Sequence, residues 1–271
     1  MNVDLHLHTT LSDGSLSPSQ LFAKLQQNEV RLFSLTDHDL LQPEDIISQF
    51  SFNPKKDFFV YIPGVEISVK SASNRSYHIL LYFKPILVNP ELCPIFLFKF
   101  LTLGAETDYQ NLIPILNQTK MNRKNRLNQI LAKYDLNESD FYKQYSFEGT
   151  KLIRKYLNAN QIDIDEKTIK KQFEMETPFF NELKHIQCTM SLAHPGSYGY
   201  TKQQIEEDMD EFRTHPGFKA VETDRRIDLD EYCKKYSLKR TKGSDYHDKG
   251  QVGYPMKLAN VVELLEMLFE Q

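Results

Sequence analysis

The sequence predicts an α/β fold in which strands and helices alternate and most of the strands run parallel. Short stretches of alternating apolar and polar residues indicate strands, and amphipathic helical stripes lie between them. The same rhythm recurs in the first 83 residues and again after residue 187. Strands that alternate with helices form mainly parallel sheets with right-handed crossovers. With 271 residues, 40% of them hydrophobic, the chain can bury a sizeable core in one large domain or two small ones.

The first strand and helix are predicted within the first thirty residues. Apolar and polar residues alternate over residues 3–8, and the polar positions (Asp4, His6 and His8) all carry potential metal ligands. A helix should begin after Ser17, with Pro18 in its first turn and Gln20 completing a capping box. The apolar stripe of this helix is formed by Leu21, Phe22 and Leu25.

The later elements follow in order. Further strands are predicted over residues 31–36, 58–65, 77–83, 188–193, 218–222 and 238–243. Helices are predicted over residues 43–50, around the apolar positions Ile205, Met209 and Phe212, and over residues 261–269.

Residues 84–186 break the rhythm and predict a mainly helical insertion, while residues 1–83 and 187–271 form the body. Leu127, Ile130, Leu131 and Tyr134 lie at helical spacing. Residues 119–155 carry nine Lys/Arg against four Asp/Glu, a net charge of +5, which leaves −9 on the rest of the chain. The insertion could therefore cover an acidic site as a lid or substrate domain; alternatively, these charges belong to a solvated helix pair.

Composition excludes several classes of protein. The net charge of −4 gives no reason to expect long nucleic acids or a membrane surface as partners. Cys93, Cys188 and Cys233 form neither a CxxC pair nor a disulfide framework, and residues 1–8 do not resemble a signal peptide, so a cytoplasmic location is expected. The longest apolar stretch, residues 92–103, is too short to span a bilayer.

Ligand-type side chains recur where predicted strands end. They are His6, His8, Asp13, His38, Glu66, His78, His194, Asp245 and His247. Each has an ordinary alternative, such as a turn at Asp13 or a core histidine at His78. Sites in α/β folds form at the carboxyl ends of strands, and six of the eight histidines occur there. Together these residues predict a metal centre, with His185 and His215 left in structural or surface roles.

Six segments resemble the successive motifs of the PHP (polymerase and histidinol phosphatase) family. They are DLHLHTTLSDG, TDHD, GVEIS, YHILLYF, LAHPGSYG and KGSDYH, which cover most of residues 1–83 and 188–256 in the right order. The branch that the chain most resembles contains bacterial nucleoside 3′,5′-bisphosphate phosphatases and short-RNA 5′-exonucleases, which also carry a helical insertion. The resemblance implies a distorted seven-stranded, TIM-like β/α barrel with two or three divalent metal ions.

The resemblance also implies a ligand set for each ion. The first ion would be held by His6, His8, Glu66 and Asp245. Glu66 would bridge to a second ion held by His78 and His194. The third ion would be held by Asp13, His38 and His247. Nitrogen and oxygen ligands without thiolate suit zinc, manganese or iron, and spacing does not choose among them.

Such a centre predicts hydrolysis of a phosphomonoester of a small metabolite, with a nucleoside 3′,5′-bisphosphate as one candidate. A metal-bridged hydroxide would be the nucleophile, and Asp37 could orient a ligand histidine or simply cap the backbone. Five cationic residues are candidates for substrate binding: Arg123, Arg126, Lys151, Arg225 and Arg226. Arg123 and Arg126 resemble an RxxR helix of the family insertion. Lys151 and Ile153 stand where relatives carry arginine and histidine in a Thr-Arg-x-His segment.

Three other functions stay open at this point. Related metal sites cleave diesters, so a 5′-exonuclease acting on very short oligonucleotides is the first alternative. A histidinol-phosphatase-like enzyme is the second. The third is a metal-binding regulatory protein without turnover, which the departures at Lys151 and Ile153 would allow. The sequence does not predict the oligomeric state.

Overall fold

The computed structural model describes residues 1–53, 58–88 and 109–269, and it divides ten strands between two five-stranded sheets. The first sheet has the order β10 (Tyr254–Pro255), β1 (Asn2–Asp4), β2 (Val30–Phe33), β3 (Phe59–Tyr61) and β6 (Ile86–Val88). The second has the order β4 (Gly64–Lys70), β5 (Ser76–Tyr82), β7 (Thr189–Leu192), β8 (Phe218–Glu222) and β9 (Lys239–Thr241).

The α/β class is confirmed, but the mainly parallel sheet is not. The pairs β1–β2, β2–β3, β7–β8 and β8–β9 are parallel, whereas β10–β1, β3–β6, β4–β5 and β5–β7 are antiparallel. The strand predicted over residues 58–65 is in fact two strands, because the chain turns at Pro63, which has no N–H for a ladder. Glu66 therefore lies near the start of β4 and not at the end of a strand.

Isolated backbone contacts join the two sheets on both sides. Beyond β1, Leu7 forms a parallel bridge with Tyr246, which follows β9. Beyond β2, His38 forms a parallel bridge with Glu66 in β4. A single closed sheet of seven strands is not shown, but these contacts bring the ends of both sheets to one place.

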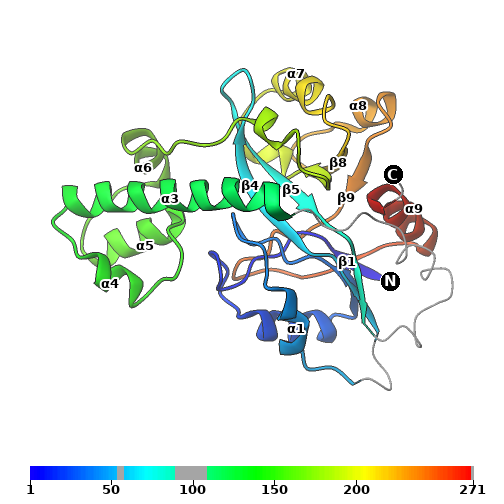
Figure 1. Cartoon of the computed structure of the whole chain (residues 1–271), viewed down its shortest axis with the longest axis horizontal. Helices are drawn as coiled ribbons and strands as arrows, with labels where there is room; N and C mark the ends of the chain where they lie inside the picture. Colours follow the sequence, from blue (N-terminus) through cyan, green and yellow to red (C-terminus); the bar gives the residue numbers. More distant parts are fainter. Residues whose placement is uncertain (54–57, 89–108, 270–271) are drawn as a thin grey trace.

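The described helices cover the sheets and build the insertion (Figure 1). Those of the body are α1 (Pro18–Gln27), α7 (Lys202–Phe212), α8 (Asp230–Lys235) and α9 (Leu258–Phe269), with short 3₁₀ turns at Glu44–Gln49, Phe180–Leu183 and Pro195–Ser197. Those of the insertion are α3 (Tyr109–Lys133), α4 (Glu138–Tyr142), α5 (Thr150–Ala159) and α6 (Glu166–Gln172).

Local sequence signals explain where α1 begins and which side it buries. The predicted capping box is confirmed: the Ser17 side chain accepts a hydrogen bond from the Gln20 backbone, and the Gln20 side chain returns one. Leu21, Phe22 and Leu25 are buried against β2 and β3, as their spacing predicts. The helix predicted over residues 43–50 is a 3₁₀ helix instead.

The insertion has its own apolar cluster, separate from those of the two sheets. Leu127, Ile130, Ile153 and Tyr156 are among its buried members. In Figure 1 the helices α4, α5 and α6 gather beside the far part of α3, while its near part lies against the body. The apolar stretch at residues 92–103 lies outside the described residues. Within the described residues, no helix is long and apolar enough to cross a bilayer.

Candidate metal centre

The structure brings all nine predicted ligand residues into one cluster where the two sheets meet. Three sets of potential ligand atoms lie within 4.8 Å of one another: His6, His8, Glu66 and Asp245; His38, Glu66 and His78; and His8, Asp13, His38 and His247. His194 joins through Glu66, whose Oε1 lies 3.0 Å from its Nε2. The grouping differs from the expected sets in two ways. His8 also belongs to the third set, and His38 also belongs to the second set.

Glu66 lies at the centre of the cluster, and its two oxygens face different histidines. Oε1 lies 2.8 Å from His78 Nδ1 and 3.0 Å from His194 Nε2. Oε2 lies 3.1 Å from Nε2 of both His6 and His8. This arrangement follows from strand register, since Glu66 pairs with Leu80 across the β4–β5 hairpin and His78, two residues away, points to the same face.

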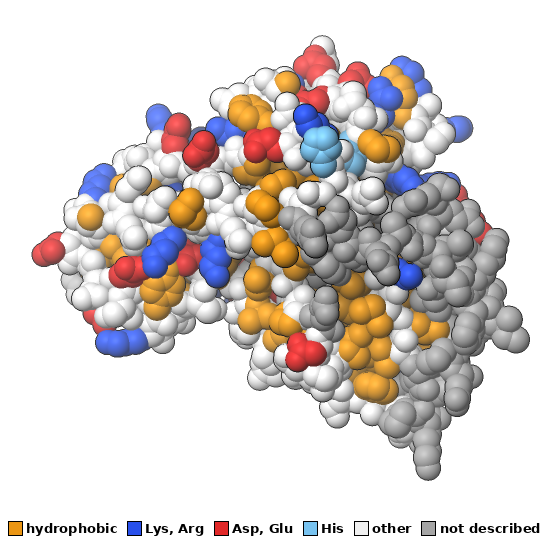
Figure 2. All heavy atoms as spheres, viewed as in Figure 1, with side chains coloured by type: hydrophobic (Ala, Val, Ile, Leu, Met, Phe, Trp, Pro, Cys, Tyr) orange, Lys and Arg blue, Asp and Glu red, His pale blue; other side chains and the backbone are white. Residues whose placement is uncertain are grey.

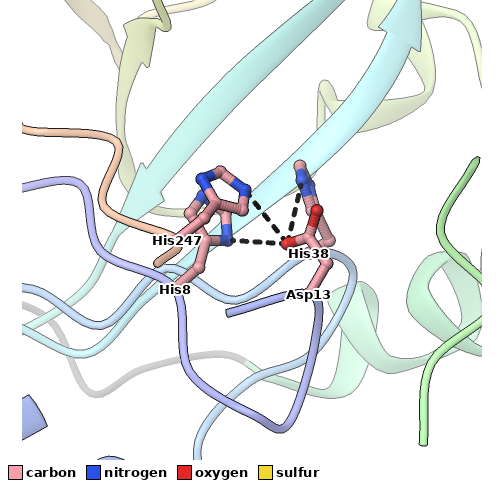
Figure 3. A group of neighbouring side chains, drawn as sticks. All are labelled: His8, Asp13, His38 and His247. Carbon is pink, nitrogen blue, oxygen red and sulfur yellow. Dashed lines mark ion pairs between the residues drawn. The ribbon is translucent and has the colours of Figure 1, made fainter. Parts of the chain in front are cut away.

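Asp13 collects the histidines of the third set (Figure 3). Its Oδ1 lies 3.1 Å from His247 Nε2 and 3.8 Å from both His8 Nδ1 and His38 Nε2. These residues come from the loop after β1, the loop after β2 and the loop after β9. In Figure 3 the three imidazoles point toward the same carboxylate oxygen from different segments.

Four of the histidines have a further partner at Nδ1 and direct Nε2 into the cluster, although His8 Nδ1 also faces Asp13 Oδ1 at 3.8 Å. The outer partners are Glu222 for His6 (3.2 Å), Ser12 for His8 (3.4 Å), Ser197 for His194 (2.6 Å) and the carbonyl of Asp245 for His247 (2.9 Å). Both serine hydroxyls donate elsewhere, so each can accept the imidazole N–H. Metal-binding histidines in proteins are commonly held in this way, since the outer hydrogen bond fixes the tautomer.

The inward-facing atoms lack hydrogen-bond partners that would explain their closeness. Asp13 Oδ1, His38 Nδ1 and Glu66 Oε2 are buried without a hydrogen-bond partner. Nε2 of His6 and Nε2 of His8 lie only 3.1 Å apart, and both carry lone pairs when their Nδ1 atoms are protonated. Unsatisfied buried polar atoms are rare in native proteins. Divalent cations between these atoms would satisfy them, so the side chains fit a metal cluster.

The electrostatics of the cluster also favour a cationic occupant. Burial acts to lower the pKa of His6, but the carboxylates of Glu66, Glu222 and Asp245 outweigh it and raise the pKa well above its usual value. For His8, burial is likewise outweighed by contacts with Asp245 and Glu66, which raise the pKa to about 10. Burial opposes ionisation of Asp245, yet the neighbouring histidines hold its pKa far below the usual range. The carboxylates around His6 and His8 thus favour positive charge at this site.

Exposure grades from one side of the cluster to the other. His6, His8 and Glu66 are fully buried, whereas the side chains of Asp245 and His78 are 40% and 31% exposed. The buried residues form a floor and the exposed ones a rim. The cluster is most exposed beside Asp245 and His78, which is the side open to a substrate.

The backbone is strained at this rim. His194 and Asp245 have φ values of 24° and 51°, and Asp39, directly after His38, has a φ of 50°. Non-glycine residues adopt such conformations at a cost of about 1–3 kcal/mol, and they gather at functional sites. The strain is consistent with loops that are held for ligand geometry.

Two buried carboxylates in this region were not assigned from the sequence. Asp4 accepts hydrogen bonds from the backbone N–H groups of Ser244 (2.9 Å) and Gly253 (2.8 Å), so it anchors the loop that carries Asp245 and is not a ligand. Glu222, the last residue of β8, contacts His6. The strand-end rule that identified the other residues would have included Glu222.

Asp37 touches the cluster only indirectly. Its carboxylate accepts hydrogen bonds from the backbone and hydroxyl of Thr9 (2.7 and 2.8 Å) and from Ser12. Ser12 in turn contacts His8. Asp37 therefore holds the loop after β1, which is the capping alternative, and reaches a ligand histidine only through a serine.

The two arginines of the RxxR helix have different environments. Arg123 is committed to an ion pair with Asp39, in which both side chains are buried, and its guanidinium lies 4.9 Å from the centroid of the Phe147 ring. Arg126 is 5% exposed, makes one long hydrogen bond to the Glu148 carbonyl (3.4 Å) and leaves Nε without a partner. Burial, with the nearby charge of Arg123, lowers the pKa of Arg126 to about 10, so it remains cationic at neutral pH.

The insertion contacts the third set of ligands through residues 146–149. The Phe147 ring stacks against His38 with centroids 6.0 Å apart, and the Ser146 hydroxyl donates to the Thr10 carbonyl (2.8 Å). Gly149, the N-cap of α5, has no side chain to cap the helix. Since Arg126 bonds to the residue before Gly149, a free cation and an uncapped helix N-terminus lie together.

The remaining cationic candidates are less enclosed. Arg226 pairs bidentately with Asp224 (2.9 and 2.8 Å), and Asp224 also accepts from the backbone of Gly196, near His194. Arg225 is exposed in the same loop, and Lys151 is half-buried in the first turn of α5. Ile153 is fully buried in the insertion's apolar cluster, so its side chain faces away from solvent and cannot replace a substrate-binding histidine.

The basic segment does not form one uniform positive surface. Lys124 pairs with Glu138 (3.2 Å) and Arg154 with Glu166 (3.4 Å), both at partly exposed positions. On the face in Figure 2, basic side chains of the insertion lie among acidic ones. Most of these charges therefore match the solvated-helix alternative, and Arg126 stands apart from them by its burial.

Comparison with known proteins finds the same fold in solved structures. No family model matches the chain, and no curated protein matches it. An amidohydrolase from Chromobacterium violaceum, solved with sulfate and without metal, is 19% identical with a TM-score of 0.70 over 98% of this chain and 97% of that one. A Bifidobacterium adolescentis protein named, by prediction, a metal-dependent phosphoesterase is 16% identical, with a TM-score of 0.69 over 97% and 95% of the two chains. The chain thus has a fold similar to that of these two proteins over nearly the full length of each.

Proposed function

We propose that this protein is a metal-dependent phosphoesterase that hydrolyses a phosphomonoester of a small metabolite. The observation that carries the proposal is the position of Glu66, whose two oxygens face different histidines within one buried cluster. The name of the Bifidobacterium protein and the sulfate in the Chromobacterium structure agree with it. The PHP family and its distorted seven-stranded barrel are part of the same proposal, supported by the motif order and by the backbone contacts that join the two sheets.

The geometry of the cluster supports the ligand assignment. Two or three divalent ions (zinc, manganese or iron) would be held by the nine residues, with Glu66 shared between sets. When bound, such ions polarise phosphoryl oxygens and lower the pKa of water, which makes a nucleophile available at neutral pH. The chain's own side chains fix the ions, because the outer partners of the histidines hold each imidazole in one orientation.

Substrate recognition is assigned to the insertion and to the rim loop after β8. Arg126, buried but without a partner at Nε, would bind non-reacting phosphate oxygens together with the uncapped N-terminus of α5. Arg226 is already oriented by Asp224 and would serve the open side of the cluster, with Arg225 and Lys151 farther out. Arg123 is not proposed to bind substrate, because its guanidinium is already paired with Asp39.

The insertion would act as a cover for the third ligand set. The stacking of Phe147 on His38 and the hydrogen bond from Ser146 to Thr10 support this role. A small phosphorylated substrate is proposed, and a nucleoside 3′,5′-bisphosphate is the first candidate. The net charge of −4 argues against a long nucleic acid as the partner.

The test is phosphate release by purified protein. Metal-free protein would be reloaded separately with Mn²⁺, Zn²⁺ or Fe²⁺ and assayed on a panel of nucleotides with 3′- and 5′-phosphates, with histidinol phosphate included. Release that depends on added metal supports the proposal, and no release with any of these ions contradicts it. Labelled di- to pentanucleotides in the same assay distinguish a monoesterase from a short-oligonucleotide exonuclease, because the exonuclease yields mononucleotides.

A further inference from the structure

Glu222 is a buried carboxylate that contacts two ligand-bearing segments at once. Its side chain is 4% exposed at the end of β8. Oε1 lies 3.2 Å from His6 Nδ1. Oε2 accepts the backbone N–H of His194 at 2.7 Å. One side chain thus reaches a ligand of the first expected set and a ligand of the second.

The backbone around Glu222 leaves room for this contact. A Cβ placed on Gly243 would lie 2.2 Å from His6 Cβ and 2.6 Å from Glu222 Oε1, both far inside van der Waals contact. Any larger residue at position 243 would have to displace the imidazole or the carboxylate. The chain therefore passes close to the His6–Glu222 pair only because it has glycine there.

His194 needs such a hold on its backbone. Its φ of 24° and ψ of 60° are unusual for a residue with a side chain, and such a conformation persists only when its surroundings fix it. The hydrogen bond to Glu222 is charge-assisted, which makes it stronger than a bond between neutral groups. It fixes the point from which the His194 imidazole reaches Glu66.

We propose that Glu222 is a positioning residue that couples the first two metal sites by orienting His6 through its side chain and His194 through its backbone. This inference rests on the proposed function, since it presumes that ions bind. Glu222 contacts neither Asp13, His38 nor His247 through any described hydrogen bond or ion pair. Its influence is therefore selective for two of the three sets.

The substitution Glu222→Gln tests this selectively. Glutamine keeps the shape but removes the negative charge that both hydrogen bonds use, and its amide nitrogen is a donor that cannot accept from His6 Nδ1–H or His194 N–H. Glu222→Asp is the second variant, since it keeps the negative charge but shortens the side chain by one methylene, which moves the carboxylate away from His6 and His194. Glu231→Gln, at an exposed position in α8, is the matched control.

The measurement is the number and affinity of bound Mn²⁺ ions, determined on metal-free protein by equilibrium dialysis and elemental analysis. Each variant is also made with His247→Asn, so that binding to the first two sets is read without the third. Outer partners of metal ligands typically contribute 10–100-fold to metal affinity. We expect Glu222→Gln and Glu222→Asp to weaken the first two sites by about that factor and to leave the third unchanged.

The outcomes separate this inference from the proposed function. If the unaltered protein binds no ion, the proposed function fails and this inference fails with it. If it binds ions and Glu222→Gln binds them with unchanged affinity, only the role of Glu222 is wrong. Equal weakening of all three sites would show a general structural role and overturn the selective one.

Discussion

The cluster of nine ligand residues and the helical insertion both bury charged groups, but different kinds of group are left unsatisfied in the two regions. In the cluster, carboxylate and imidazole atoms face one another with no hydrogen-bond partner at Asp13 Oδ1, His38 Nδ1 and Glu66 Oε2. In the insertion, Arg123 is fully engaged by Asp39, whereas Arg126, one helical turn later, keeps a free Nε. The cluster leaves ligand-type atoms unsatisfied, whereas the insertion leaves donor atoms of a buried arginine unsatisfied.

This difference separates ligand-binding groups from scaffold groups. A buried polar atom without a partner costs about 1–3 kcal/mol, so a folded protein retains it only when something else satisfies it. The cluster atoms would be satisfied by metal ions, and Arg126 by an anion. Arg123, with its partner already present, belongs to the scaffold. Substituting a group that has its partner should therefore affect stability, whereas substituting one without a partner should affect the binding of metal or substrate.

The largest effect is expected from Glu66→Gln. The substitution removes one oxygen ligand and the negative charge from a side chain that serves two ligand sets, so bound Mn²⁺ should fall to what the third set alone retains. Since outer partners alone are worth up to about 100-fold, we expect kcat/KM for phosphate release to fall by more than that. Elemental analysis and the phosphate assay measure the two effects. Exposed Glu174→Gln is the control, and a full metal content in Glu66→Gln would contradict the central role of Glu66.

Arg123→Met should act mainly on stability. It leaves Asp39 buried without its partner, and breaking a buried pair from one side costs about 3–5 kcal/mol. Denaturant unfolding of the metal-free protein measures the loss. Lys124→Met, at the neighbouring exposed pair with Glu138, should cost less than about 1 kcal/mol.

A double variant sharpens the assignment of Arg123. Asp39→Asn removes the charge that Arg123→Met leaves unpaired, so the two changes together should cost less than the sum of their separate costs. Additive costs would mean that the pair does not connect the insertion to the loop carrying His38.

Arg126→Met should act on substrate and not on stability. A hydrogen bond to a charged group is worth about 1.5–3 kcal/mol, so kcat/KM should fall roughly 10–100-fold, mostly through KM. The free energy of unfolding should not fall, because the guanidinium makes one long hydrogen bond (3.4 Å), its Nε has no partner, and methionine keeps an apolar stem of similar length. Michaelis kinetics compared with Arg154→Met, which removes an exposed cation from the same insertion, give the test. Equal losses in both variants would indicate a general charge effect.

The sequence predicted the cluster better than the sheets that carry it. The ligand pairs His6/His8 and Asp245/His247 could be predicted from local sequence, because alternate residues of an extended chain share a face. The sheet direction depends on the break at Pro63, which splits one predicted strand into β3 and β4 and starts the antiparallel β4–β5 hairpin. An apolar run does not show whether its neighbour will be parallel or antiparallel.

Substrate residues were the hardest to predict. Arg123 and Arg126 are equivalent in sequence, and only tertiary contacts distinguish the arginine that Asp39 occupies from the one with a free Nε. Glu222 could have been found by the strand-end rule, but its partner His6 lies 216 positions away and no local pattern joins them. Pairings of this kind become visible only in the fold.

The smallest effect concerns His215, a buried histidine outside both regions. Its Nε2–H donates to the Leu183 carbonyl (3.0 Å) and its Nδ1 accepts from Gly217 N–H (2.9 Å), so the neutral form is fully satisfied. Burial lowers its pKa from the usual value of about 6.5. As pH falls below that value the unfolded chain binds a proton that the folded chain does not, so this contribution is complete at neutral pH and is lost on acidification.

His215→Gln, which cannot titrate but can make both hydrogen bonds, should therefore lose less stability than the unaltered protein between pH 7 and pH 5. The expected difference is about 1 kcal/mol, measured by denaturant unfolding of metal-free protein so that the cluster contributes equally to both. Exposed His185→Gln is the matched control for loss of an imidazole. If the stability of His215→Gln has the same pH dependence as that of the unaltered protein, titration of His215 does not contribute to stability. Hydrogen bonding would then not explain the contrast between His215 and the unsatisfied histidines of the cluster.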